Sequence, residues 1–295
     1  MRAVEVQPGG NTLVLDPYSI LETGNILVFP RSFFEEAPED REFLLSIRPS
    51  EDQYHKNIAY RPNIDRVSGF GKMDPAWIER LRSVMREYSR RVVAFAGNLL
   101  PGYQAKWRLD FASLRPLEEE GRVLALKKRN DLLHTDAFPT RPTNGGLILR
   151  FFTNIHPEKT RVWVTSEPFG VAAARYAREA GLNGFARGSM HQLRKALAWV
   201  GLAPPGRSRY DEFMLAFHDF LKRNEEYQQS CPKYRFEFPP GTSWMVFTDI
   251  VPHSVESGQS AVEQTFIVAP DSLESPDRAP VSILEKLAGI SLRLN

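Results

Sequence analysis

Two groups of strand-like segments, separated by a long helical stretch, constrain the fold of this 295-residue chain more than any other feature. The first group lies in residues 103–168 and the second in residues 235–268. Both consist of short runs rich in β-branched and aromatic residues, bounded by glycine, proline and polar residues. A core built from both groups must join strands that are distant in the chain. The expected strands are 105–111, 122–126, 146–155, 161–164, 235–238, 243–248 and 261–268.

The helical parts of the chain show apolar residues at three- and four-residue spacing. The clearest helix is expected over residues 72–98, where Asp74 caps the first turn, Pro75 suits its first position and one apolar face packs on a core. A helical insert is expected over residues 169–230, with one helix over 189–200. Another helix begins at Ser208, since Asp211 completes a capping-box pattern.

The remaining segments carry weaker signals. Residues 12–15 and 25–29 are expected to be short strands, and residues 31–70 are expected to be polar and irregular. Residues 281–294 are expected to form a helix whose apolar side docks on the protein core, which is favoured over docking on a membrane. The chain is thus expected to be one domain over residues 1–295.

Composition excludes several functional classes. The net charge is +2 with mixed signs, so nucleic acid is not an expected partner. Cys231 is the only cysteine, which excludes a disulfide within the chain and a cysteine-based metal site. No signal peptide and no run of about 20 apolar residues is present, so any membrane contact is expected to be peripheral.

Three residues in the strand-like regions form a candidate metal site. His134 and Asp136 point to the same side of an extended segment, because side chains alternate with period two. His253 in the second group supplies another imidazole. Two histidines and one carboxylate leave open positions on Fe(II), as an oxygen-activating centre needs. A site shared by distant strands predicts a mixed α/β protein with an all-β core, namely a double-stranded β-helix (jelly-roll, cupin-like) supported by helices.

Several blocks of sequence resemble one family of oxygenases. Pro240-Gly241 precedes an apolar strand and then His253, which is similar to Fe(II)/2-oxoglutarate-dependent oxygenases. The blocks 130–138, 150–155, 161–163, 253–259 and 263–266 resemble the Kdo 3-hydroxylases, where Kdo is 3-deoxy-D-manno-oct-2-ulosonic acid. The resemblance covers roughly residues 20–268. It implies hydroxylation at C3 of a Kdo sugar on a lipid A precursor, with Fe(II), 2-oxoglutarate and O2, giving succinate and CO2. It also implies lipopolysaccharide assembly in the cytoplasm, with peripheral contact at the inner membrane left open.

The cosubstrate anchor departs from the wider oxygenase pattern. Many members carry an arginine about ten residues after the distal histidine, but this chain has Glu263 and Gln264 there. Arg150 is the predicted anchor for the C5 carboxylate, because period two places it with Asn154 on one face of a largely apolar strand. A buried guanidinium needs an anion. A structural ion pair with an internal acid is the alternative. Asn154 and Gln264 are weaker candidates for hydrogen bonds to the cosubstrate.

Basic and aromatic residues near these motifs are candidates for substrate binding. Lys127, Lys128, Arg129 and Arg161 are predicted to meet the sugar carboxylates and phosphates, against the alternative of a solvated charged face. Trp163 is predicted to stack on the sugar, against the alternative of a core position. Arg115 and His55 are further candidates for substrate contact, whereas His156, His191 and His218 are expected to have surface or packing roles.

The favoured function is a non-haem Fe(II) hydroxylase. Two alternatives remain open at this point: a cupin-like, metal-dependent sugar epimerase or isomerase, and a non-catalytic lipopolysaccharide-binding protein. Consumption of oxygen and 2-oxoglutarate separates the hydroxylase from both.

Overall fold

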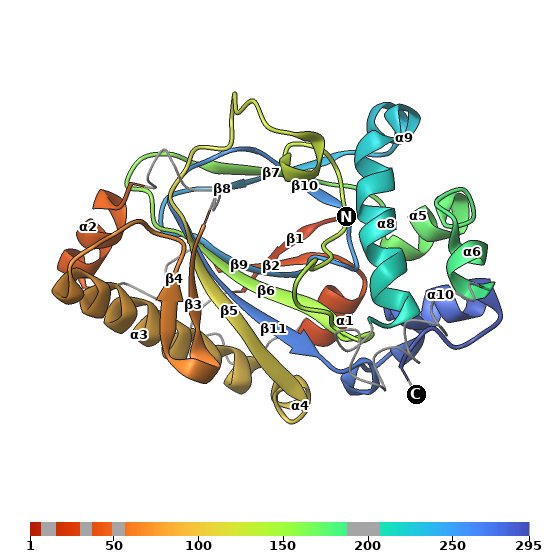
Figure 1. Ribbon diagram of the computed structural model, residues 1–295, viewed down its shortest axis with the longest axis horizontal. Coiled ribbons are helices and arrows are strands. Elements are labelled where there is room, and N and C mark those ends of the chain that lie inside the picture. Colours follow the sequence, from red (N-terminus) through yellow and green to blue (C-terminus); the bar gives the residue numbers. More distant parts are fainter. Residues whose placement is uncertain (7–15, 30–36, 49–56, 188–206, 295) are drawn as a thin grey trace.

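Two β-sheets face each other in the computed structural model, which describes residues 1–6, 16–29, 37–48, 57–187 and 207–294 (Figure 1). Neighbouring strands are antiparallel except for the parallel pair of β1 and β2. The large sheet has the order β1 (Ala3–Glu5), β2 (Ile26–Phe29), β9 (Ser243–Phe247), β6 (Leu147–Asn154), β11 (Ala261–Val268), β5 (Trp107–Arg115), β3 (Ile58–Arg61) and β4 (Arg66–Ser68). The small sheet has the order β10 (His253–Ser257), β7 (Arg161–Thr165) and β8 (Tyr234–Phe238).

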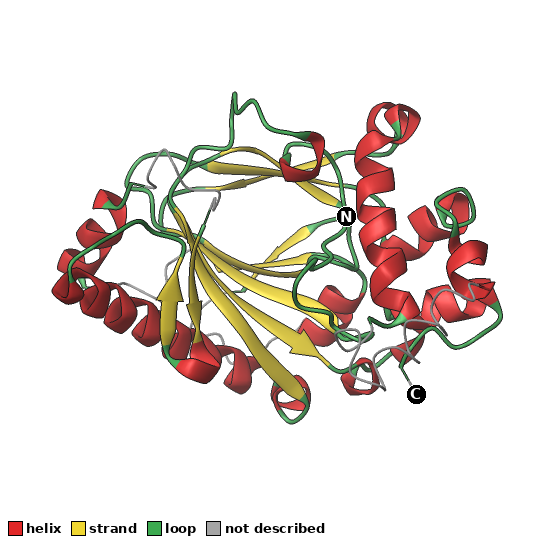
Figure 2. Cartoon of the chain, viewed as in Figure 1, coloured by secondary structure: helices red, strands yellow, loops and turns green. Residues whose placement is uncertain are grey.

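Helices lie along the large sheet and at one end of the two sheets (Figure 2). The longest, α3 (Pro75–Leu99), begins as predicted: Asp74 accepts a hydrogen bond from the Trp77 amide, and Pro75 occupies the first turn. Its apolar face, which includes Leu81, Met85 and Val92, joins the main hydrophobic cluster. The other α-helices in the part of the chain that the structure describes are α1 (Pro17–Glu22), α2 (Pro38–Ser46), α4 (Pro101–Gln104), α5 (Phe169–Tyr176), α6 (Leu182–Arg187), α8 (Arg209–Arg223), α9 (Glu225–Ser230) and α10 (Pro280–Ala288).

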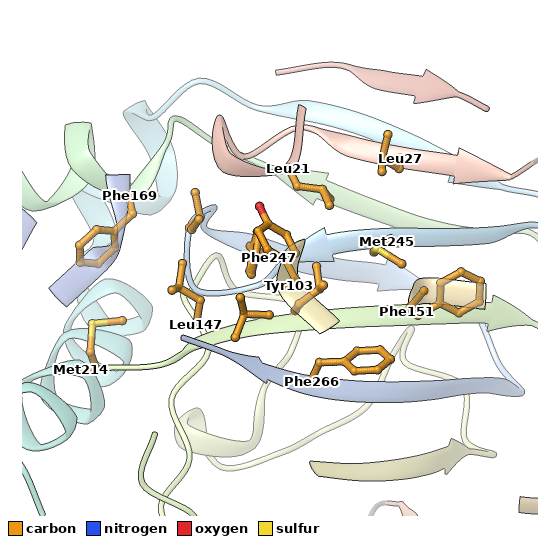
Figure 3. Packing of buried hydrophobic residues seen from close by; sticks show 14 of the residues in the cluster. Leu21, Leu27, Tyr103, Leu147, Phe151, Phe169, Met214, Met245, Phe247 and Phe266 are labelled. Carbon is orange, nitrogen blue, oxygen red and sulfur yellow. The ribbon is translucent and has the colours of Figure 1, made fainter. Parts of the chain in front are cut away.

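Strand alternation divides the apolar side chains into two clusters. Leu147, Leu149 and Phe151 of β6 belong to the main cluster, together with Met245 and Phe247 of β9 and the helices (Figure 3). The intervening residues of the same strands point into the space between the sheets. There the rings of Phe152, Trp244 and Phe238 stack, with centroid distances of 5.1 and 4.0 Å, and Trp163 packs edge-on against them. The predicted parity of β6 is therefore correct.

Most predicted strands are present. β11 has the predicted bounds, and β6, β7, β8 and β9 agree within one residue at each end. The predicted strand at 122–126 is wrong: this stretch is a loop leading into the 3-10 helix Leu126–Lys128. Residues 31–70 are not irregular throughout, because α2, β3 and β4 lie within them. The segments 12–15 and 189–200 lie outside the described residues.

The helical insert begins and divides as local caps dictate. Ser208 accepts a hydrogen bond from the Asp211 amide, so α8 begins where the capping box predicts. Asn224 ends α8 and caps α9 through the Tyr227 amide, so the single helix that the sequence pattern predicts over residues 208–227 is divided into two.

The last helix, α10, packs against α5 and α6, with Val281 and Leu284 fully buried. Its apolar side thus docks on the protein, as favoured. Among the described helices, none combines the length and apolar character needed to cross a bilayer.

Candidate metal centre

The chain brings His134, Asp136 and His253 together at the start of β10. The amides and carbonyls of His134 and His253 pair with each other, at 3.1 and 2.9 Å, and the Asp136 amide donates to the Thr248 carbonyl at 2.9 Å. The Leu133 amide also donates to the side-chain oxygen of Gln228 in α9 at 3.0 Å, and the side-chain nitrogen of Gln228 donates to the Leu133 carbonyl at 2.9 Å. One candidate ligand atom from each of the three side chains lies within 4.8 Å of the other two.

The side chains have the orientation and charge that a divalent cation needs. Nδ1 of His134 donates to the Leu132 carbonyl at 2.6 Å, and Nδ1 of His253 donates to that of Val251 at 3.2 Å. Each ring therefore keeps its Nε2 lone pair for a ligand. Burial lowers the pKa of both imidazoles, which stay neutral. Two neutral imidazoles and one carboxylate form a donor set that suits Fe(II).

Asp136 is ionised despite its burial. Burial by itself raises the pKa of this carboxyl, but the positive charge of the Arg150 guanidinium lowers it overall. Arg150 Nη2 lies 3.1 Å from Asp136 Oδ2, although that oxygen accepts no well-directed hydrogen bond. The carboxylate is thus charged and incompletely satisfied, as a metal ligand should be before it binds its ion.

Arg150 points between the sheets, as parity predicts, and belongs to a buried charge network. Its Nη1 lies 3.2 Å from Glu263 Oε2, and Arg115 binds the same carboxylate with two nitrogens at 2.9 and 3.1 Å. Arg150 is 7% exposed, and its Nε has no hydrogen-bond partner. The ion pairs with internal acids correspond to the alternative left open by the sequence, while the unpartnered Nε–H can still donate a hydrogen bond.

Two ring side chains, those of Trp163 and His218, pack against the imidazoles of the candidate metal ligands and hold them in place. Trp163 stacks on the ring of His253 at a centroid distance of 5.1 Å and an interplanar angle of 14°. His218 of α8 packs edge-on against His134 at 4.8 Å, and its Nδ1 donates to the Thr135 carbonyl at 2.7 Å. His218 has the packing role expected of it. The stacking of Trp163 on a sugar is contradicted, because this side chain is 2% exposed and enclosed by other aromatic rings.

The predictions for Asn154 and Gln264 are also wrong. The Asn154 amide donates to the carbonyls of Lys159 and Phe238, both at 2.9 Å, and its oxygen accepts from the His156 amide. It therefore closes a turn and has no hydrogen to spare for a cosubstrate. Gln264 lies on the opposite face of the large sheet, where its oxygen accepts from Ser89 of α3 at 2.7 Å.

Arg161 does not reach a surface that a substrate could contact. It is 1% exposed, and its Nη1 donates to the Gly258 carbonyl at 3.0 Å. Glu119 compensates its charge weakly, since Arg161 Nη2 lies 3.9 Å from Glu119 Oε1. The close approach of the chain at Gly258, where a Cβ atom would lie 2.7 Å from the Arg161 side chain, buries this arginine.

The basic run lies at the surface. Lys127 pairs with Asp219 at 3.0 Å and Arg129 with Asp131 at 2.5 Å, while Lys128 is exposed. These pairs are compatible with either a solvated face or a substrate contact. His55 and His191 lie outside the described residues, and His156 accepts hydrogen bonds from the amides of Glu158 and Lys159.

Arg115 and Glu263 are the site residues whose roles sequence reasoning missed. Alternation along β11 places Glu263 opposite Phe152 of β6 and Ser113 of β5, on the inner face. A charged residue within a strand that is otherwise buried was the available signal.

Comparisons with known proteins agree with this geometry. The model of the 3-deoxy-D-manno-oct-2-ulosonic acid (Kdo) hydroxylase family matches residues 12–291. The crystal structure of the Kdo hydroxylase KdoO, a non-heme Fe(II) alpha-ketoglutarate dependent dioxygenase, in complex with alpha-ketoglutarate and Fe(III), is 31% identical, with a TM-score of 0.86 over 99% of this chain and 98% of that one. The apo structure of KdoO is 32% identical, with a TM-score of 0.87 over 99% and 98% of the two chains. A comparison with curated protein sequences gave no match.

The match spans nearly the whole chain and confirms the resemblance that the separate sequence blocks suggested. The chain therefore belongs to the Kdo hydroxylase family.

Proposed function

We propose that this enzyme hydroxylates C3 of a Kdo sugar in a lipid A precursor, using Fe(II), 2-oxoglutarate and O2 and releasing succinate and CO2. The observation that carries the proposal is the convergence of two neutral imidazoles and one ionised carboxylate beside the buried Arg150, in a member of a Kdo hydroxylase family. Family membership places the enzyme among the non-haem Fe(II)/2-oxoglutarate-dependent dioxygenases, as expected.

His134, Asp136 and His253 are the proposed iron ligands. The Nδ1 hydrogen bonds to backbone carbonyls fix both imidazole rings, so their Nε2 atoms need no rearrangement to bind. Bound Fe(II), with 2-oxoglutarate as reductant, supplies the activation of O2 that oxidation of an unactivated C–H bond requires. The stacked Trp163 and the edge-on His218 exclude water from the protein side of the ligands.

Arg150 is the proposed anchor for the far carboxylate of 2-oxoglutarate. Its Nη2 lies beside Asp136 and compensates the charge of that carboxylate. If Asp136 held a divalent cation, Nη2 would be free to bind another anion together with the unpartnered Nε. These two nitrogens form the fork that binds a carboxylate bidentately. Glu263, itself held by Arg115, keeps Nη1 in place.

The chemistry of the sugar supports oxidation at C3. In a 3-deoxy-oct-2-ulosonic acid, C3 is the ring carbon without oxygen, next to the carbon that bears the carboxylate. Insertion of one oxygen atom at this methylene gives an ordinary polyhydroxylated sugar acid. The exposed Lys127 and Lys128 and the half-buried Arg129 are proposed to meet acidic groups of the glycolipid, and the substrate-facing side would then lie near a membrane surface.

We also propose that the two sheets form a double-stranded β-helix. β5, β6, β9 and β11 supply four strands of the large sheet, and β7, β8 and β10 supply three of the small one. The segment around His134 lies beside β10 through the bridge between His134 and His253, and it supplies the fourth strand-like segment of the small sheet. This arrangement explains why the metal residues lie at the mouth of the space between the sheets.

Product analysis tests the function. The enzyme is incubated with Fe(II), 2-oxoglutarate, O2 and Kdo-lipid A, and the products are measured by mass spectrometry and NMR. We expect the glycolipid to gain one oxygen atom at C3, with one succinate formed per product. A product of unchanged mass, formed without O2, would instead identify an epimerase or isomerase. Binding of the glycolipid without any product would identify a non-catalytic binding protein.

A further inference from the structure

Guanidinium groups and phenyl rings alternate in a stack that leads away from the metal centre. Arg150 Cζ lies 5.4 Å from the ring centre of Phe138. Arg141 Cζ lies 4.3 Å from that same centre and 4.0 Å from the ring centre of Phe111. Arg61 Cζ lies 5.1 Å from Phe111. We call these five residues the cation–aromatic stack.

Separate parts of the chain build the stack. Phe138 follows Asp136 by two residues, Phe111 belongs to β5, and Arg61 ends the neighbouring strand β3. Arg141 comes from the loop before β6, and its Nε donates to Asp110 Oδ2 at 2.9 Å. A guanidinium held against two rings and by one carboxylate loses little further freedom when it binds a ligand.

Positive charge predominates at the outer end of the stack. Asp110 is the only carboxylate of the described residues that forms an ion pair with Arg141, and none of them forms one with Arg61. Arg141 is 29% exposed in its side chain, and Arg61 is half-buried with an Nε that has no hydrogen-bond partner. The remaining N–H groups of both arginines are suited to an anionic ligand.

We propose that Arg141, flanked by Arg61, binds the carboxylate of the sugar acid that is hydroxylated. This inference rests on the proposed function. In a 2-ulosonic acid, the carboxylate carbon and C3 are both bonded to C2, so they lie only about 2.5 Å apart by ordinary bond lengths and angles. The carboxylate must therefore stay close to the metal when C3 faces it.

Arg141 is the next guanidinium along the stack from Arg150. It lies one ring away from Arg150, whose Nη2 is 3.1 Å from Asp136. Arg150 itself is engaged with Glu263 and is the proposed cosubstrate anchor. A planar guanidinium binds a carboxylate through two parallel hydrogen bonds, which fixes the orientation of the sugar as well as its position.

A lipid phosphate would satisfy the same guanidinium chemistry, so the test must separate the two sources. The ligands are a Kdo glycolipid with its lipid phosphates, the same glycolipid from which these phosphates have been removed, and the methyl ester of the sugar carboxylate of the dephosphorylated form. Binding is measured anaerobically by calorimetry with Fe(II) and 2-oxoglutarate present, so that no turnover occurs. The variants are Arg141→Met and Arg141→Lys. Arg90→Met is the matched control, since Arg90 is an exposed arginine on α3.

Arg141→Met should weaken binding of the acid by about 10- to 100-fold, as expected for loss of a charge-assisted hydrogen bond. The affinity of Arg141→Met for the ester should differ from that of wild type by less than about threefold, because the ester carries no negative charge with which Arg141 could pair. Arg141→Lys should recover part of the affinity for the acid, and Arg90→Met should match wild type.

Equal losses for acid and ester would make Arg141 a structural residue and overturn the inference. So would an effect seen only when the lipid phosphates are present, because the subsite would then bind phosphate. Failure of the proposed function is a separate result: wild type would bind the glycolipid without oxygenating it, while the acid–ester comparison would still decide the role of Arg141.

Discussion

Replacing Arg150 by methionine removes the cation that lies between Asp136 and Glu263 while keeping much of the side-chain volume. Glu263 keeps its bidentate partner Arg115, but Asp136 loses the guanidinium at 3.1 Å. An uncompensated buried carboxylate costs about 3–5 kcal/mol. The metal-free variant should lose free energy of unfolding of that order.

A divalent cation should reverse much of this loss, because it compensates Asp136 in place of Arg150. The difference in unfolding free energy between variant and wild type should therefore be smaller with Co(II) bound than in chelator. Affinity for 2-oxoglutarate should nevertheless fall by about 30-fold or more, or roughly 2 kcal/mol, since the fork for the far carboxylate is missing. Arg150→Lys should restore only part of it, because an ammonium group lacks the planar fork.

Urea unfolding with and without Co(II) measures the first effect, and anaerobic titration with 2-oxoglutarate measures the second. Arg90→Met on the exposed face of α3 is the control for both. The reasoning is refuted if Arg150→Met binds 2-oxoglutarate as wild type does. It is also refuted if the metal-free variant is as stable as wild type, because Asp136 would then not depend on Arg150.

Three further changes test other parts of the account. Asp136→Ala should abolish turnover and iron binding while the circular dichroism spectrum stays that of the folded protein; unfolding would make Asp136 structural. Changing Lys127 and Arg129 together to glutamine should raise the apparent KM by about threefold at low salt and less at high salt, because both charges are exposed and already paired; an unchanged KM at low salt would assign them to a solvated face. Burial raises the pKa of the Asp249 carboxyl to about 7. Between about pH 4 and 7, the folded metal-free protein therefore keeps the carboxyl proton of Asp249, whereas the unfolded chain loses it. The free energy of unfolding should fall as the pH rises through this window. Asp249→Asn should thus stabilise the protein at pH 8 by up to about 4 kcal/mol and have little effect near pH 4, whereas equal effects at both pH values in thermal unfolding would contradict the buried neutral carboxyl.

Local sequence patterns were sufficient to predict the helices and strands whose structure is decided by residues close together in the chain. β11 was predicted with its observed bounds because eight residues rich in β-branched and apolar side chains lie between two polar turns. Ser208 was predicted to start α8 from its capping pattern, and the faces of β6 followed from alternation. The grouping of His134, Asp136 and His253 was also predicted, since an alternating pair and a distant strand residue need only a closed β-core to meet.

Features that depend on contacts between distant segments were not predictable in this way. β3 and β4 are short strands at the edge of the sheet, and the pairing of β3 with β5 and of β4 with β3 decides their structure. Gln264 lies on a strand with polar residues in both parities, so only the packing of α3 shows which face is inner. The network of Arg115, Arg150 and Glu263 joins three strands and has no signature in any one of them.

Anaerobic titration of the metal-free enzyme with Fe(II) and 2-oxoglutarate tests the central claim most directly. The chelate of 2-oxoglutarate on Fe(II) has a visible charge-transfer band. The account predicts that this band saturates at one Fe(II) per chain and is lost in His253→Ala, whose folded state is checked by circular dichroism. Absence of the band in wild type at saturating concentrations, or its persistence in folded His253→Ala, would contradict an iron centre built from His134, Asp136 and His253.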